Sequence, residues 1–388
     1  MFRTSQPDDA AGPFARLASP LVSADRSIYH MVFYGLLLDQ RGLPQPNNWD
    51  EWLGAICQHR LAGVALRAAD RRDIEVPPGI IAALRERVFA DASRSGYAVA
   101  HAVTAQTALS AGGIPSLVLK GPAIAQYAGG YALRPFGDVD FLVAPAHFRR
   151  AYRLLHGLGF REPTRSIAPW RSFDRLCREA VNMRTDDGGS LDLHHHVPPW
   201  LWGQEATLRR LLPHATEMLT QSGNLLVGNA ALNLLVASLH VVSDHNQPGK
   251  TFMVWRDLLT LARVVSPSDV QKCAQLLGLT SWLRAVLLSL PVDARPSTLC
   301  DALGGSAPRP RYRRRLAALT NPAVVAHSSL SQCARLPLAN AALFGLGTTF
   351  PSPSFVRLKL PNAAHPYLAW WSQAGGRYLH APGTGTST

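Results

Sequence analysis

Three short apolar runs of strand length, set between long stretches of helical periodicity, constrain the fold of this chain most. The runs span residues 116–119, 138–143 and 190–196, and turn-forming segments rich in Gly precede the first and third. Short apolar runs beside such turns predict β-strands. In contrast, apolar residues recur at i, i+3 and i+4 from residue 27 to about 110 and again beyond Trp202, which is typical of amphipathic helices. We therefore predict an α+β fold, with a small mixed sheet embedded between helical segments.

The same changes of pattern divide the chain into five regions. Residues 1–26 are rich in Pro, Ala, Ser and Asp without periodicity, which predicts a mobile arm. An N-terminal helical region is expected over 27–111, the sheet-containing core over 112–200 and a second helical region over 201–300. Within the core, residues 145–158 predict a helix closed by Gly159. Residues 301–388 form a basic region rich in Pro and Gly.

The charge of the chain is strongly positive and unevenly distributed. The formal net charge is +13, and residues 302–388 contain nine Lys or Arg residues but no Asp or Glu. Such an excess favours an anionic partner, whether nucleic acid, a nucleoside triphosphate, an acidic peptide or a membrane surface. The Arg-Tyr-Arg-Arg-Arg cluster at 311–315 would either bind the phosphates of a nucleic acid or form a solvated helix face, and the sequence leaves both readings open.

Composition excludes several classes of protein. Of the 388 residues, 47% are hydrophobic and 17% charged, a balance typical of a folded core and not of intrinsic disorder. The five cysteines are widely spaced without a C-x-x-C pair, which indicates buried thiols in a reducing compartment. No apolar stretch reaches the roughly 18 residues of a membrane span, and the N-terminus lacks signal-peptide features. We expect a cytoplasmic protein without a membrane partner.

Two of the predicted strands carry carboxylates that suggest a metal site. Residues two apart on a strand point to the same face, so Asp138 and Asp140 would lie together with Cα atoms about 6.5 Å apart. Like charges this close resist joint ionisation unless a cation lies between them. Asp192, which alternates with Leu191 and Leu193 on the third run, would complete a triad. Carboxylate oxygens suit Mg²⁺ or Mn²⁺, although D-x-D pairs also occur on solvated strand edges.

A Lys120-Gly121-Pro122 sequence follows the first predicted strand, where a helix is expected to begin. Backbone N–H groups and the helix dipole at such a position can hold phosphate oxygens. Gly121 would let the backbone approach a ligand closely, and Pro122 suits the first helical position. Lys120 is one of only four lysines in the chain. Alone, the motif more often describes an ordinary turn than a phosphate site.

The order of these motifs resembles the uncharacterised nucleotidyltransferase family of the polymerase-β-like superfamily. The resemblance covers most of residues 45–260. Its motifs are Leu119-Lys120-Gly121, Arg134, a Gly-Asp-Val-Asp-Phe-Leu-Val run at 137–143, a helix ending in Leu-x-x-x-Gly-Phe at 155–160, Leu191-Asp192-Leu193-His194 and Trp255-Arg256-Asp257. Better-known members of the superfamily carry Gly-Ser at the phosphate turn, where this chain has Gly121-Pro122.

The resemblance implies an enzyme that moves a nucleoside monophosphate from an NTP, ATP among them, to an acceptor and releases pyrophosphate. The acceptor would be a small molecule, a peptide or an RNA, with the basic C-terminal region as a candidate nucleic-acid contact. The implied catalytic and metal-binding residues are Asp138, Asp140 and Asp192, with Mg²⁺ or Mn²⁺ as the cofactor. The implied nucleotide-binding residues are Lys120, Gly121, Arg134, Gly137 and His194.

Alternatives stay open for several of these features. Arg134 and Arg256 would meet either phosphate oxygens or a carboxylate in an ion pair. The three histidines at 194–196 could suggest a zinc tract, but alternation on a strand separates the middle ring, so His195 and His196 are expected to be structural. Glu179 would reach the metal site only if a strand placed it beside Asp192. At the level of function, the alternatives are a non-catalytic nucleotide-binding accessory protein and an RNA-modifying transferase toxin.

Overall fold

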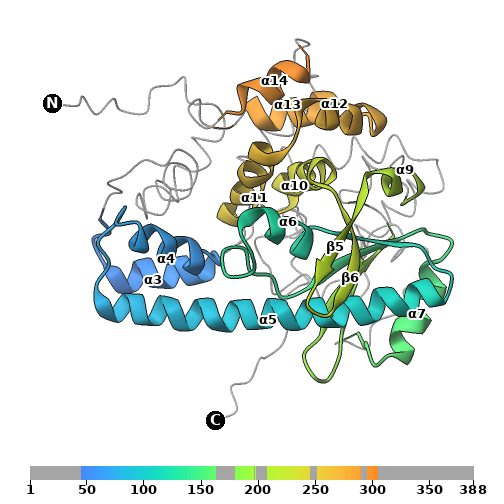
Figure 1. Cartoon of the computed structure of the whole chain (residues 1–388), viewed down its shortest axis with the longest axis horizontal. Helices are drawn as coiled ribbons and strands as arrows, with labels where there is room; N and C mark the ends of the chain where they lie inside the picture. Colours follow the sequence, from blue (N-terminus) through green and yellow to red (C-terminus); the bar gives the residue numbers. More distant parts are fainter. Residues whose placement is uncertain are drawn as a thin grey trace, which may run out of the picture.

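The computed structural model describes residues 45–162, 180–195, 197, 208–244, 251–288, 290 and 295–304. The predicted N-terminal arm, Glu179, His196 and the basic cluster at 311–315 lie outside these residues. The described chain forms a six-stranded mixed sheet flanked by helices (Figure 1). This architecture confirms the predicted fold class.

The three predicted strands occupy the middle of the sheet. The strand order is β3-β4-β2-β1-β6-β5. Their bounds are β1 Ser116–Leu119, β2 Val139–Val143, β3 Ala180–Arg184, β4 Ser190–His194, β5 Ala215–Thr220 and β6 Gly223–Gly228. Strand β2 pairs with β1 antiparallel and with β4 parallel, while β1 pairs with β6 parallel. The two outer strands pair antiparallel with their neighbours, β3 with β4 and β5 with β6. The sheet is therefore mixed.

Alternating side chains give the sheet two buried faces. Val118, Phe141 and Leu193 lie on one row across β1, β2 and β4, and they pack in a cluster with α5 (Pro78–Ala111) and α7 (Phe148–Gly157). The intervening residues Leu119 and Leu142 belong to the second cluster, with the C-terminal helices. Because both faces are covered, every residue of β1 and β2 is buried, as is expected for strands in the middle of a two-sided core.

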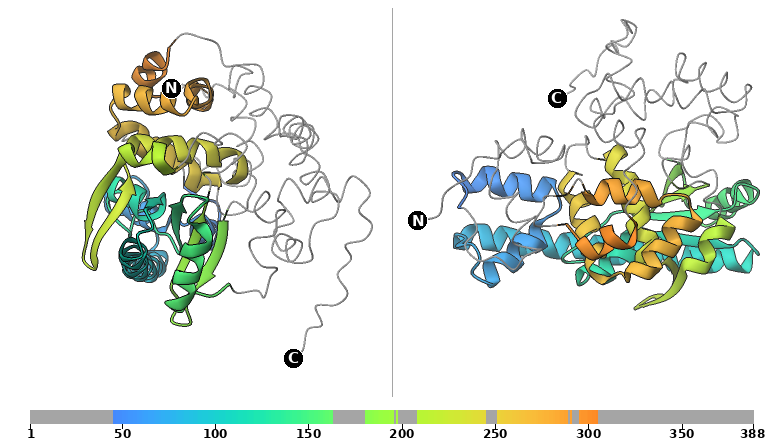
Figure 2. Two further views of the ribbon diagram at one scale, coloured as in Figure 1. Left: turned by 90° about the vertical axis from the view of Figure 1, so that its right-hand side faces the viewer. Right: turned by 90° about the horizontal axis from the view of Figure 1, so that it is seen from above.

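Helices cover the sheet from opposite sides. Helix α5 runs along one side of the molecule, whereas α10 (Ala230–Asp244) and α11 (Thr251–Val264) lie on the other, followed by α12 (Pro267–Leu276), α13 (Thr280–Leu288) and α14 (Ser297–Ala302), as Figures 1 and 2 show. The short α6 (Gly121–Ala128) packs on α10 and α11. Short α9 (Leu208–Leu211) and the 3₁₀ turn η2 (Leu212–His214) lead into β5.

Local sequence signals explain where the N-terminal helices begin. In α3 (Trp49–Gln58), the Asn48 side chain accepts hydrogen bonds from the N–H groups of Asp50 and Glu51, the usual N-cap arrangement. Helix α4 (Ala62–Asp70) follows after a short turn, and α5 begins at Pro78, a position where the missing N–H of proline has no cost. Pro77 and Pro78 therefore mark the start of α5 after α4. Trp52 and Ile56 anchor α3 in the core.

The prediction of helical structure throughout 201–300 was wrong for one segment. Residues 215–228 form the β5–β6 hairpin, which extends the sheet beside β1. Strand β5 is an edge strand in which only Met218 is buried, so it lacks the apolar alternation that predicts a strand. The Ser222-Gly223 turn was the local signal for a hairpin, with Gly223 at φ +133°.

Other boundaries shifted slightly. Strand β2 begins at Val139, so Asp138 immediately precedes it, and α7 begins at Phe148 because the chain first turns with the His147 N–H donating to Ala144 O. The described cysteines, Cys57, Cys273 and Cys300, are free thiols. Among the described helices, none has both the length and the hydrophobicity that a membrane crossing requires.

Candidate active site

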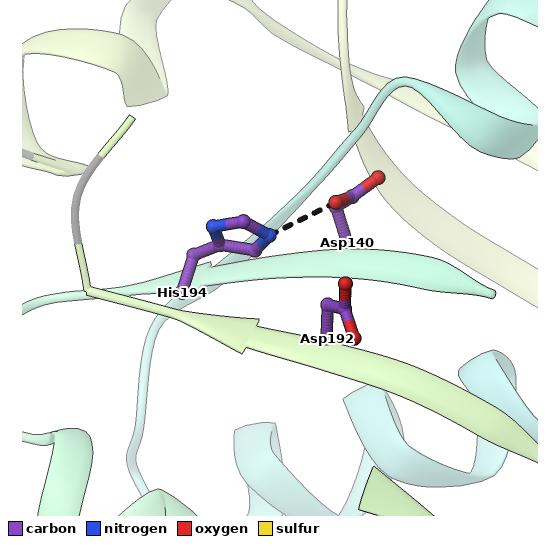
Figure 3. Close-up of side chains that lie close together, drawn as sticks. All are labelled: Asp140, Asp192 and His194. Atoms are coloured by element: carbon purple, nitrogen blue, oxygen red, sulfur yellow. Dashed lines mark hydrogen bonds and ion pairs between the residues drawn. The ribbon is translucent and has the colours of Figure 1, made fainter. Parts of the chain in front are cut away.

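Two neighbouring strands place three side chains with potential metal-ligating groups on one face of the sheet. Parallel pairing sets Asp140 of β2 directly beside Asp192 of β4, and the two-residue repeat puts His194 on the same face as Asp192. One ligand atom from each residue lies within 4.8 Å of the other two. Figure 3 shows all three side chains converging above the strands. The predicted strand geometry thus brings Asp140 and Asp192 together.

Asp138 lies close to these three side chains but is not one of the set whose ligand atoms lie within 4.8 Å of one another. Asp138 is exposed, and His194 takes the third place in that set. The pKa of Asp138 is raised by partial desolvation and by the negative charges of Asp192 and Asp140, whereas Lys120 and Arg60 oppose that shift. The predicted triad of Asp138, Asp140 and Asp192 is therefore electrostatically connected, but in this structure His194 completes the tightest set of ligand atoms.

Asp140 is the most strongly stabilised anion of the site. Its Oδ1 accepts from the Lys120 ammonium at 3.1 Å and from His194 Nε2 at 2.9 Å. Because a carboxylate oxygen can only accept, Nε2 carries the proton in this contact. Burial alone would raise the pKa of Asp140, but Lys120, His194 and, at longer range, His240 hold it well below its ordinary value. Asp140 is therefore ionised at neutral pH.

Asp192 is positioned by the neighbouring edge strand. Asn182 of β3 lies directly opposite Asp192, and its Nδ2 donates to Asp192 Oδ1 at 2.6 Å. This contact orients the carboxylate and leaves Oδ2 without a hydrogen-bond donor among the described residues. The sequence signal for Asn182 was a polar residue between the buried Val181 and Met183, but its partner depends on the strand register.

The predicted phosphate turn has an unusual backbone. Lys120 has φ +52° and ψ −128°, which non-glycine residues rarely adopt, and Gly121 follows with φ +22°. The Lys120 N–H donates to the Oδ1 of Asn233 at 2.8 Å. Asn233 is fully buried on α10, and its Nδ2 donates to Gly228 O and Asn229 O, so its Oδ1 must face Lys120. Strain of this kind persists only where surrounding contacts impose it.

We expect Lys120→Gly to be more stable than Lys120→Ala by about 1–3 kcal/mol, because glycine accepts the positive φ and alanine retains the strain. Both variants lose the ammonium that contacts Asp140, so that loss cancels in the comparison. Chemical denaturation of the two variants measures the difference. An alanine variant as stable as the glycine variant would show that the backbone of Lys120 is not strained.

Arg134, predicted to contact phosphate, is instead held in a buried ion pair. Its Nε and Nη2 donate to the two carboxylate oxygens of Asp257 at 3.2 and 2.6 Å, and its Nη1 donates to Gly121 O at 3.4 Å. Burial disfavours its charge, but Asp257 outweighs that effect and raises the pKa of Arg134. This is the ion-pair alternative that the sequence left open. Through its contact with Gly121 O, Arg134 supports the backbone of the turn at Lys120 and Gly121.

Arg256 makes a second contact with the same carboxylate. Its Nη2 donates to Asp257 Oδ1 at 3.3 Å, and its Nη1 donates to Arg60 O and Leu133 O, both at 3.2 Å. Burial lowers the pKa of Arg256 to about 10, with Asp257 opposing the shift. Arg256 is therefore still a cation at neutral pH, and it joins α11 to two loops beside the site.

The other predicted residues, Gly137 and His195, lie beside protein side chains. Gly137 is half-buried, and a Cβ there would meet Arg94 Cδ at 3.7 Å, so this position is close to a basic side chain. His195 is buried with its ring against Phe148 at 4.8 Å, in agreement with its expected structural role. Asn233 was missed by sequence reasoning, because only the tertiary structure brings α10 to the turn at Lys120.

Comparisons with known proteins identify the family of this chain. The sequence model of a family described as uncharacterised nucleotidyltransferase matches residues 45–290. Among solved structures, the chain is similar to an antigenic nucleotidyltransferase-like protein from Paracoccidioides brasiliensis, with 16% identity over 48% of this chain and 92% of that one, and a TM-score of 0.31. The comparison with curated proteins gives no match. Because the family match spans well over half of the residues, including β1, β2, β4 and α11, the chain belongs to the uncharacterised nucleotidyltransferase family.

Proposed function

We propose that this protein is a metal-dependent nucleotidyltransferase that moves a nucleoside monophosphate from an NTP to an acceptor, with release of pyrophosphate. The observation that carries the proposal is the convergence of Asp140, Asp192 and His194 on one sheet face, with Asp138 and Lys120 beside them. Family membership supports the same class of reaction.

The donor set fits a hard divalent cation. Asp138, Asp140 and Asp192 offer carboxylate oxygens, which suit Mg²⁺ or Mn²⁺, and close carboxylates favour a cation between them. These three residues would hold the metal, with His194 next to them. When bound, the metal would neutralise phosphate charge and lower the pKa of the acceptor group.

In the proposed reaction, an acceptor oxygen attacks the α-phosphorus of the NTP. The bond from the α-phosphorus to the bridging oxygen breaks, and pyrophosphate leaves with the electron pair. The acceptor proton passes to Asp192 Oδ2, since Asn182 already engages Oδ1. Lys120, at the start of α6, would bind a phosphate oxygen on approach of the substrate, while Asn233 and Arg134 keep the turn in place.

Incubation of the full chain with each of the four α-labelled NTPs, Mg²⁺ or Mn²⁺ and a panel of acceptors tests the function. The panel contains small hydroxylic compounds, peptides and RNA. We expect labelled product and pyrophosphate in equal amounts, and loss of both when EDTA removes the metal. Tight nucleotide binding that is independent of metal, without pyrophosphate, would contradict transfer and favour the accessory-protein alternative.

A further inference from the structure

A buried serine on α5 holds the segment that leads into Asp138. Ser95 is fully buried, and its Oγ accepts from the Phe136 N–H at 2.9 Å. The same hydroxyl can donate to Phe136 O or to Asp91 O, both at 2.9 Å, and its single proton serves one of them at a time. One side chain of α5 thus contacts both backbone polar groups of Phe136, two residues before Asp138.

The strand registers that fix the other carboxylates begin only after Asp138. The pairing of β2 with β1 runs from Val143 to Asp140, and the pairing with β4 begins at Val139. Asp140 is therefore held between two neighbouring strands, whereas Asp138 precedes the first residue of β2 in either register. The position of its carboxylate depends on how the chain enters the strand.

The segment before β2 packs against the start of α6 as well as against α5. A Cβ on Gly121 would lie 3.5 Å from both Asp138 O and the Phe136 ring, and a Cβ on Gly137 would lie 3.7 Å from Arg94 Cδ of α5. These are ordinary contact distances. Because closely packed groups transmit strain, a shift at Phe136 would move Asp138 relative to the rest of the site.

We propose that Ser95 is a positioning residue for nucleotide transfer, which sets the place of the Asp138 carboxylate through the backbone of Phe136. The inference rests on the proposed function, in which Asp138 helps to hold the metal. Without the hydroxyl, the N–H of the buried Phe136 would lack this acceptor, and that cost favours a shift of the segment. A misplacement of about 1 Å in a reacting group can cost roughly a hundredfold in rate.

Binding of Mn²⁺ to the full chain, measured by calorimetry, and steady-state transfer test this role together. We expect Ser95→Ala to raise the Kd of Mn²⁺ by about tenfold, the lower end of the range for residues that orient metal ligands. The same variant should lower kcat by about tenfold to a hundredfold. The KM of the NTP should change little, because Asn233 holds the turn at Lys120 independently.

The matched control is Gln106→Ala, which removes a second buried polar side chain from the same helix. Gln106 bonds to the backbone N–H and C=O of Leu226 on β6, at 2.6 and 3.2 Å, and so joins α5 to a different strand. This variant should lower the thermal stability of the chain but leave the Kd of Mn²⁺ and kcat unchanged. A Ser95→Ala variant that loses only thermal stability would show that Ser95 is merely structural.

Action through Asp138 further predicts that the two substitutions are not additive. In an Asp138→Ala background, Ser95→Ala should change the Kd of Mn²⁺ by less than about twofold. An equal fold-change in both backgrounds would overturn the role of Ser95. Should Ser95→Ala fail to fold, Ser95→Cys replaces it, because a thiol is a weaker donor and acceptor, and it should show the same changes at smaller size.

Two results separate failure of this inference from failure of the proposed function. If Ser95→Ala binds Mn²⁺ and transfers nucleotide as the unmodified chain does, Ser95 has no positioning role, while transfer by the unmodified chain upholds the function. If the unmodified chain neither binds Mn²⁺ nor transfers nucleotide, the proposed function fails, and the role of Ser95 fails with it.

Discussion

Asp257→Ala is expected to lower the free energy of unfolding by about 3–5 kcal/mol, the usual cost of removing one partner from a buried ion pair. Two cations depend on this carboxylate. Arg134 and Arg256 are 5% and 3% exposed, and both donate to Asp257. Without it, each would keep a buried positive charge next to the other. Urea denaturation of the full chain, followed by circular dichroism, measures the loss.

The matched control for Asp257→Ala is Asp187→Ala, which removes a largely exposed carboxylate that accepts from Thr185 and lies 3.4 Å from His101. Exposed pairs contribute roughly 0–1 kcal/mol, so this variant should be close to the unmodified chain.

The pH dependence of the free energy of unfolding provides a second test of the Asp257 ion pairs. The pKa of Asp257 is lowered because Arg134 and Arg256 outweigh the effect of burial. Its stabilising contribution is therefore complete above the ordinary pKa of 3.8 and is lost as pH falls through the lower native value. An equal effect of the Asp257 and Asp187 substitutions near neutral pH would refute the buried network.

The second large effect is expected for Asp140→Asn, which should reduce nucleotide transfer by about a thousandfold or more. Asparagine preserves the shape of the side chain but removes the negative charge. Loss of an electrostatic contribution of several kcal/mol to the transition state corresponds to a rate decrease of this size. The strongly lowered pKa of Asp140 shows that its surroundings favour the anion, so the charge is the property that the site is built to keep.

Three measurements separate a catalytic defect from a structural one for Asp140→Asn. Binding of Mn²⁺ should weaken together with transfer, whereas the circular dichroism spectrum should be unchanged. Asp187→Asn makes the same chemical change at an exposed position and should keep full activity. A rate of nucleotide transfer by Asp140→Asn within tenfold of that of the unmodified chain would show that Asp140 is not a catalytic residue.

Local patterns predicted those parts of the site that are close in sequence. Asp192 and His194 share a face because the side-chain period of a strand is two, and Lys120 stands where β1 ends and α6 begins. Two departures concern detail: Asp138 falls just outside β2, and Pro122 is the second residue of α6 and not the first. The edge strand β5 was missed, because an exposed strand does not need the apolar alternation that identifies a buried one.

Long-range contacts account for what local patterns could not predict. Arg134 and Asp257 are 123 residues apart in the chain, and Lys120 and Asn233 are 113 apart. Nothing in the sequence near Arg134 distinguishes an arginine that contacts substrate from one that neutralises a buried carboxylate. That distinction depends on where α11 packs, and the packing of α11 follows from the whole hydrophobic cluster and not from one segment.

The sequence alone determined that the chain has a small mixed sheet between helices and that carboxylates on two of its strands share one face, because strand periodicity and turn residues act over a few residues. The tertiary structure decided which charged groups stay available for a substrate. It buried Arg134 and Arg256 against Asp257, and it set Lys120 and His194 on Asp140. Charge interactions are decided by distance in space and by burial, and neither quantity is encoded in local spacing.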